Sequence, residues 1–123
     1  MKKIFFLCVI GFSLFACGDD SEEKQPEKPK DVSQSPEYKN GLELATKSNC
    51  FTCHDIDNKL TGPPYREIAN KYAAAPDTIV SHLAGKIISG GSGVWGNIPM
   101  IPHPDLSKAD AETIVRYILL LKK

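Results

Sequence analysis

An all-α fold of four to five short helices is the architecture that this sequence predicts for the C-terminal part of the chain. Apolar residues recur with helical period in three stretches, residues 65–73, 78–89 and 107–121. Glycine and proline separate these stretches. The chain offers few alternating runs of β-branched residues, the pattern that strands would require.

The first helix is expected over residues 38–47 and leads directly into Cys50. A loop follows over residues 59–64, because Gly62 and two prolines interrupt any regular element there. Pro64 can open the second helix, since proline is favoured at the first helical position.

Asp77 is expected to cap a third helix over residues 78–89, and Gly90 to end it. The last helix follows Ser107, which together with Asp110 resembles a capping box with Asp in the place of Glu. We expect this C-terminal helix to cross the first one. Its inward face comprises Ala111, Ile114, Val115, Ile118 and Leu119.

Residues 90–104 are expected to form neither helix nor strand, because they contain four glycines and three prolines. The same segment is too apolar for an exposed loop. Its large apolar side chains are Val94, Trp95, Ile98, Met100 and Ile101. Such a loop must lie against an apolar partner.

The pentapeptide Cys50-Phe51-Thr52-Cys53-His54 is the chemically informative motif. In C-x-x-C-H, two thiols reach the vinyl groups of a haem and the imidazole reaches its iron. A redox thiol pair and half of a zinc site are the alternatives. The first would need strands around the motif and the second a further ligand pair, and the sequence supplies neither. We therefore predict haem c, covalently attached through Cys50 and Cys53.

The N-terminus resembles a bacterial export signal, with Lys2 and Lys3 followed by twelve uncharged residues. This stretch is too short to span a bilayer, which requires about 20 apolar residues. The sequence before Cys17 resembles a lipobox, so we predict a lipoprotein signal peptide over residues 1–16 and a lipid on Cys17. Cleavage of an ordinary signal peptide near Ala16 is the alternative.

Residues 17–36 are predicted to be a disordered tether, because the stretch after Cys17 holds six acidic residues, three lysines and three prolines. An acidic run at this place resembles the surface-export signals of some bacterial lipoproteins, and a solvated spacer is the simpler interpretation. The folded domain is then residues 37–123, whose ten basic and nine acidic side chains give no indication of nucleic-acid binding.

From Glu37 onwards the chain resembles the small bacterial class I cytochromes c of the c-551/c-552 type. Three motifs carry the resemblance: CFTCH at residues 50–54, LTGPPY at 60–65 and GVWGNIPM at 93–100. It implies a cytochrome c fold, with His54 and Met100 as the two iron ligands. Met100 is also the only methionine besides the initiator.

The resemblance further implies that the carbonyl of Pro63 accepts a hydrogen bond from His54 Nδ1, and that the indole of Trp95 lies near a haem propionate. Two residues depart from the family pattern. Lys86 replaces an arginine that often binds the same propionate, and lysine cannot make the bidentate contact. His103 replaces an asparagine that often supports the methionine sulfur. We expect this imidazole to face solvent, and the alternatives are that it supports the sulfur or competes for the iron. His82 is expected on a helix surface.

The function that follows is that of a monohaem electron carrier in a respiratory chain, and not of an enzyme. Its expected partners are a reductase as donor and a terminal oxidase or reductase as acceptor, and the protein is expected to be an exported, membrane-anchored monomer in the periplasm or at the cell surface. A haem enzyme or gas sensor in which Met100 dissociates, and an electron-entry subunit of a stable complex, are the alternatives.

Overall fold

The structure is a computed structural model that describes residues 31–123. The predicted signal peptide, Cys17 and most of the predicted tether lie outside the described residues. The helices are α1 (Pro36–Lys47), α2 (Tyr65–Lys71), α3 (Thr78–Ser89) and α4 (Lys108–Leu120), and the short 3-10 turns are η1 (Val32–Gln34) and η2 (Cys50–Thr52). The predicted mainly helical fold is confirmed.

Regular structure is present before the expected domain start at Glu37, in η1 and at the start of α1. The hydroxyl of Ser35 accepts a hydrogen bond of 3.1 Å from the backbone N–H of Tyr38, and Pro36 occupies the first helical turn. Both are favoured arrangements at a helix start, because they satisfy or remove an unpaired backbone donor. The turn η1 and the first residue of α1 therefore fall inside the segment that the sequence assigned to the tether.

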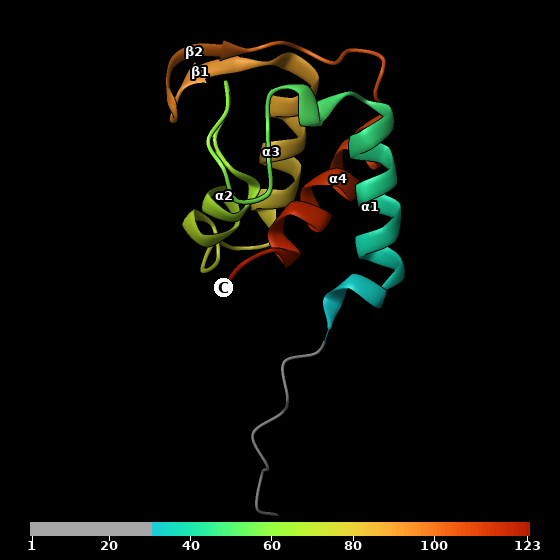
Figure 1. Ribbon diagram of the computed structural model, residues 1–123. Coiled ribbons are helices and arrows are strands. Elements are labelled where there is room, and N and C mark those ends of the chain that lie inside the picture. The colour runs from blue at the N-terminus through green and yellow to red at the C-terminus, as the bar shows by residue number, and fades with distance from the viewer. Residues whose placement is uncertain (1–30) are drawn as a thin grey trace, which may run out of the picture.

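The expected crossing of the first and last helices is present, and α1 and α4 cross on the right in Figure 1. Gly41 makes the close approach possible, because a Cβ on it would overlap the Cβ of Tyr117 and lie 2.8 Å from the carbonyl oxygen of Thr113. Tyr117 is completely buried, and the ring of Tyr38 packs edge-on against it at 5.1 Å between centroids. Tyr117 was not predicted as a core residue from the sequence.

The helix boundaries follow the predictions closely, with differences of one or two residues at α1 and α2. Ser107 caps α4 as expected, accepting a 3.1 Å hydrogen bond from the N–H of Asp110. The prediction that Asp77 caps α3 was wrong: its side chain makes no capping bond, and its backbone is already helical at φ −56° and ψ −23°. Pro64 is the residue before α2 rather than the first residue in it.

The prediction that residues 90–104 contain no strand was also wrong. An antiparallel hairpin forms from β1 (Gly91–Gly93) and β2 (Gly96–Met100), with Gly91 opposite Met100 and Gly93 opposite Gly96. Glycines at positive φ, Gly90 at 68° and Gly96 at 112° among them, accept the irregular backbone that a short bulged hairpin needs. Figure 1 shows the hairpin lying across one end of the helices, where it makes only scattered contacts with them.

Within residues 31–123, no helix has both the length and the apolar character needed to cross a bilayer.

Candidate haem site

The residues of the C-x-x-C-H motif share one tight turn. Asn49, in the left-handed conformation at φ 57°, ends the connection from α1 and starts η2. The backbone N–H groups of Cys53 and His54 both donate to the carbonyl of Cys50, at 3.2 and 3.0 Å. Cys50 is buried and Cys53 half-buried, and both are free thiols. The turn therefore brings the two thiols and the imidazole together on one short segment.

The imidazole of His54 is oriented by the loop that follows the motif. Its Nδ1 lies 2.8 Å from the carbonyl oxygen of Pro63, the contact that the sequence analysis expected. A carbonyl can only accept, so the ring nitrogen at this contact must carry the proton and donate. The other nitrogen, Nε2, is then the one with a lone pair available for a metal.

Gly62 lies against the His54 ring and is required by it. A Cβ at this position would come within 2.5 Å of Cε1, 2.8 Å of Nδ1 and 2.9 Å of Nε2 of the imidazole. The N–H of Gly62 also donates to the carbonyl of Cys53 at 2.8 Å. From the sequence, Gly62 was predicted as a breaker of regular structure and as part of the LTGPPY motif, but not as a residue that makes room for the histidine.

Tyr65 packs against the residues of the haem motif. The sequence placed it in the LTGPPY motif and in the apolar pattern of the second helix, without a role beside His54. Its ring stacks on that of His54, with 5.2 Å between centroids and 18° between planes, and meets Phe51 edge-on at 5.5 Å. Its N–H donates to the carbonyl of Asp55 at 2.9 Å. Burial, with the neighbouring Cys50 thiol as a smaller cause, raises the pKa of Tyr65 far above its usual range, so the phenol stays neutral.

The environment of Cys50 bears on the alternative of a redox thiol. Burial raises the pKa of the Cys50 thiol above its ordinary value of 9.0. A reactive cysteine in a thiol oxidoreductase has the opposite property, a pKa lowered by a helix N-terminus or a nearby cation. No group of three or more metal-binding side chains occurs in the part of the chain that the structure describes.

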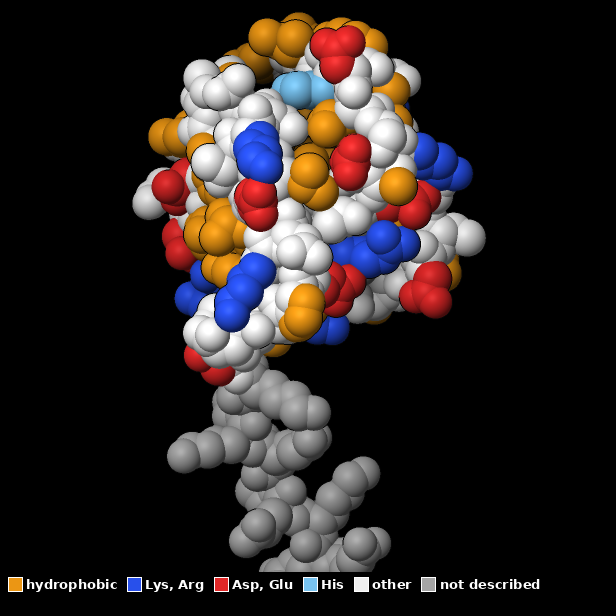
Figure 2. Space-filling model, turned by 90° about the vertical axis from the view of Figure 1, so that its right-hand side faces the viewer, with side chains coloured by type: hydrophobic (Ala, Val, Ile, Leu, Met, Phe, Trp, Pro, Cys, Tyr) orange, Lys and Arg blue, Asp and Glu red, His pale blue; other side chains and the backbone are white. Residues whose placement is uncertain are grey.

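The hairpin presents apolar side chains that no other part of residues 31–123 covers. Val94 is 57%, Ile98 66% and Ile101 71% exposed, and Leu60 lies exposed on the loop before α2. Met100, at the end of β2, is half-buried. Figure 2 shows hydrophobic side chains gathered at the end of the molecule that bears the hairpin, with a histidine among them. From the sequence, this segment was expected to lie against an apolar partner.

Of the two residues expected near a propionate, Trp95 lies in the hairpin and Lys86 lies beside it. Trp95, half-buried, occupies the turn between β1 and β2, and the Nζ of Lys71 lies 5.4 Å from the centre of its ring. Lys86 belongs to the last turn of α3, and its Nζ lies 3.7 Å from the point that a Cβ on Gly91 would occupy. Lys71 was not singled out from the sequence.

The expectation that His103 faces solvent does not agree with the structure. The residue is half-buried, and its Nδ1 is fully buried without a hydrogen-bond partner in the described residues. Its backbone N–H donates to the carbonyl of Ile87 at 3.0 Å, which ties the segment after Met100 to α3. His82 is exposed on α3, as expected.

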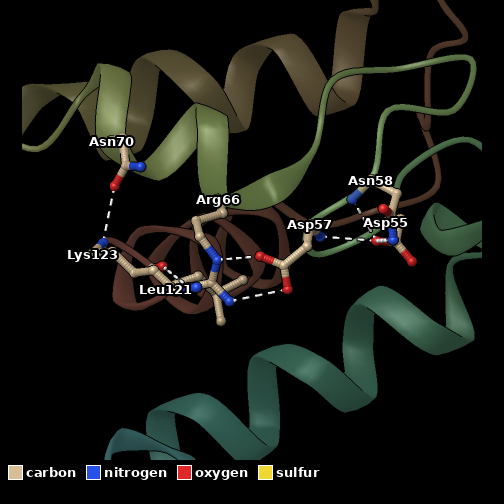
Figure 3. Close-up of polar contacts among 7 residues, drawn as sticks. All are labelled: Asp55, Asp57, Asn58, Arg66, Asn70, Leu121 and Lys123. Carbon is tan, nitrogen blue, oxygen red and sulfur yellow. Dashed lines mark hydrogen bonds and ion pairs between the residues drawn. The ribbon is translucent and has the colours of Figure 1, made fainter.

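A polar network, drawn in Figure 3, braces the segment that follows the haem motif against the end of α4. The guanidinium of Arg66 pairs with the carboxylate of Asp57 and donates to the carbonyl of Leu121. The backbone of Arg66 adds a 3.0 Å bond to the carbonyl of Ile56. The bond to Arg66 is the main cause that lowers the pKa of Asp57, and nothing in the sequence pattern indicated this network.

Taken together, these residues fit a covalently bound haem. Two free thiols and an oriented imidazole occupy one turn, and exposed apolar side chains face outward from a hairpin that contacts little else. A porphyrin is the apolar body that such side chains would cover, and its iron would accept the free nitrogen of His54.

The fold and the site thus define the class of the protein, a class I monohaem cytochrome c. A family model described as Cytochrome c matches residues 38–122, and the chain belongs to this family. Cytochrome c-552 of Nitrosomonas europaea is 49% identical over 80 residues, 65% of this chain and 77% of that protein. Cytochrome c-551 of Azotobacter vinelandii is 46% identical over 82 residues, 67% of this chain and 98% of that protein.

The solved structures agree. The crystal structure of wild-type Nitrosomonas europaea cytochrome c552 matches with a TM-score of 0.62 and 48% identity, covering 66% of this chain and 99% of that chain. The class 1 cytochrome MtoD of Sideroxydans lithotrophicus matches with a TM-score of 0.57 and 28% identity, covering 68% and 94%. Within its class the chain is thus of the c-551/c-552 type, an electron carrier and not an enzyme, with haem c attached through Cys50 and Cys53.

Proposed function

We propose that the protein is a membrane-tethered electron carrier of a respiratory chain, in which His54 and Met100 are the two axial ligands of the haem iron. The observation that carries the ligand assignment is the 2.8 Å contact between His54 Nδ1 and the Pro63 carbonyl, because it leaves Nε2 for the metal. For the second position, Met100 is the only methionine after residue 1, and it ends the strand β2 in an uncovered apolar hairpin.

Each residue has a separate task in this proposal. The haem supplies the one-electron couple between Fe(II) and Fe(III). Cys50 and Cys53 fix its position, the Pro63 carbonyl orients His54, and Met100 fills the remaining axial position so that exogenous molecules are excluded. Methionine is a neutral, soft ligand, and it raises the reduction potential relative to ligation by two histidines.

We assign Trp95 and Lys86 to the haem propionates. An indole N–H is a hydrogen-bond donor and an ammonium is a cation, so both suit a carboxylate. A lysine offers a point charge without the fork of an arginine. Lys86 would therefore make a single, flexible contact with a propionate. The placement of Trp95 at the hairpin turn and of Lys86 beside Gly91 is compatible with this assignment.

We further propose that residues 1–16 are removed as a signal peptide and that Cys17 carries a lipid, which anchors the carrier to a membrane in the periplasm or at the cell surface. The support is the sequence alone, since these residues lie outside the described part of the chain. Cys17→Ser should move the haem protein from the membrane fraction to the soluble fraction. Equal membrane retention of both proteins would refute the lipid anchor.

The partners that this function requires are a reductase that donates electrons and a terminal oxidase or reductase that accepts them. Addition of carbon monoxide to the reduced protein at neutral pH tests the role as carrier. With Met100 bound, the ferrous spectrum should stay unchanged. Rapid formation of a carbon monoxide adduct would favour the haem enzyme or gas sensor instead, and co-elution with a membrane complex in size-exclusion chromatography would favour the complex subunit.

A further inference from the structure

The hairpin that carries Met100 is attached to the helices at two places. Near its base, a Cβ on Gly90 would come within 2.5 Å of the carbonyl oxygen of Met100, so the chain ends of the hairpin lie close to the end of α3. The 3.0 Å bond from the N–H of His103 to the carbonyl of Ile87 holds the same end. At the opposite end, the turn, the contact is between Trp95 and Lys71.

Lys71 is the last residue of α2, and its ammonium group lies near two aromatic rings. Its Nζ is 5.4 Å from the ring centre of Trp95 and 6.0 Å from that of Tyr72. Both distances fall within the range of about 6 Å over which a cation is attracted to a ring face. In Figure 1 the turn of the hairpin lies on the same side of the molecule as α2.

The strands themselves supply little resistance to movement. Each is short, and their pairing is irregular between Gly91 and Gly93. Apart from Met100, which packs against the core, they make few other contacts with the helices. A hairpin held only near its base can tilt about that base, whereas a second contact at its turn opposes tilting. Strand β2 runs from Gly96, directly after Trp95 at the turn, to Met100, which pairs with Gly91 at the base, so a displacement of the turn reaches the methionine along this strand.

We infer that Lys71 is a positioning residue for Met100: through its cation–π contact with Trp95 it holds the turn of the hairpin against α2 and so keeps the methionine in place. The inference rests on the proposed role of Met100 as iron ligand. Lys71 does not touch the iron or the methionine in this account, and its effect passes through the hairpin.

Imidazole provides the test, because it binds the ferric iron of the holoprotein only after Met100 has moved away. Its apparent affinity is the intrinsic affinity multiplied by the fraction of protein in the open state. Lys71→Met keeps the length of the side chain and removes the charge. It should lower the apparent Kd of imidazole about two- to fivefold, the range that one exposed cation–π contact supports, with the near-infrared methionine-to-iron band retained before imidazole is added.

Three further variants separate this role from a general effect of charge. Lys71→Arg preserves the cation and should restore the wild-type Kd. Lys39→Met, in the first turns of α1 far from the hairpin in Figure 1, removes the same charge and should leave the Kd unchanged. In a Trp95→Leu background, Lys71→Met should have no additional effect.

An unchanged Kd in Lys71→Met, or an equal decrease in Lys39→Met, would overturn the inference while leaving the proposed ligands intact. Absence of the methionine-to-iron band from the wild-type protein would instead refute the ligand assignment itself. The two failures are therefore distinguishable in one set of spectra.

Discussion

The Nδ1 atom of His54 lies 2.8 Å from the carbonyl oxygen of Pro63, and this contact determines which ring nitrogen remains for a metal. Because the acceptor is a backbone carbonyl, its position depends on the whole loop between the motif and α2. Gly62, directly before Pro63, also lies against the imidazole. The geometry of the proximal ligand therefore depends on residues that do not bind the haem.

Gly62→Ala should destabilise the holoprotein by about 1–3 kcal/mol, the usual cost of forcing an extra methyl group into a filled site. The reason is that the new Cβ would lie 2.5 Å from Cε1 of His54, so the ring or the loop must move. Guanidinium chloride unfolding of the two proteins measures the difference, and the reduction potential reports the displaced ring.

The matched control is Gly85→Ala. A Cβ at Gly85 in α3 meets nothing within 4 Å, so alanine should stabilise the helix by about 0.5–1 kcal/mol through its better propensity. If Gly62→Ala were as stable as Gly85→Ala, the close packing under His54 would be disproved.

Gly41→Ala should destabilise the protein by about 1–2 kcal/mol, because overpacking costs about 1–3 kcal/mol and helix propensity returns up to about 1 kcal/mol. The added Cβ would overlap that of Tyr117 and separate α1 from α4. Thermal unfolding monitored by circular dichroism gives the change. A stabilised variant would show that the two helices do not approach as closely as described.

Asp57→Asn should lower the free energy of unfolding at neutral pH. It should also make that free energy depend less on pH in the acidic range. The hydrogen bond from Arg66 holds the pKa of Asp57 below its ordinary value of 3.8. A carboxylate with a lowered pKa stabilises the folded state above its ordinary pKa, and this contribution is lost as the pH falls through the lowered value. The difference in free energy of unfolding between wild type and variant should therefore be constant above about pH 5 and decrease below about pH 4.

Urea unfolding at a series of pH values provides the measurement. Asp105→Asn serves as control, because Asp105 is exposed and makes no ion pair within residues 31–123. If the free energies of unfolding of wild type and Asp57→Asn differed by the same amount down to the lowest pH, a stabilising pair between Asp57 and Arg66 would be contradicted.

The helical part of the fold was predictable because its signals are local. The bounds of α3 agree with the prediction at both ends, since a helical apolar pattern is followed by Gly90 with positive φ. The cap of α4 is also local, because the short side chain of Ser107 accepts a hydrogen bond from the N–H of Asp110, three residues later. The haem motif and the contact of Pro63 with His54 were recoverable because they depend on motifs with fixed spacing.

The remaining features depend on contacts between distant segments. Tyr117 was missed because its burial requires Gly41 on another helix. The hairpin was missed because its glycines weaken strand propensity, while backbone pairing and positive φ values decide the structure. The buried Nδ1 of His103 and the ion pair of Asp57 with Arg66 likewise arise only when the chain has folded.

The central claim is that Met100 occupies the second axial position of the haem iron. The near-infrared absorption of the ferric protein tests it most directly, through the band that arises from methionine bound to iron. We predict this band in the wild-type protein and in His103→Ala, and its loss in Met100→Ala. A wild-type spectrum without the band, or a band that persists in Met100→Ala, would contradict it.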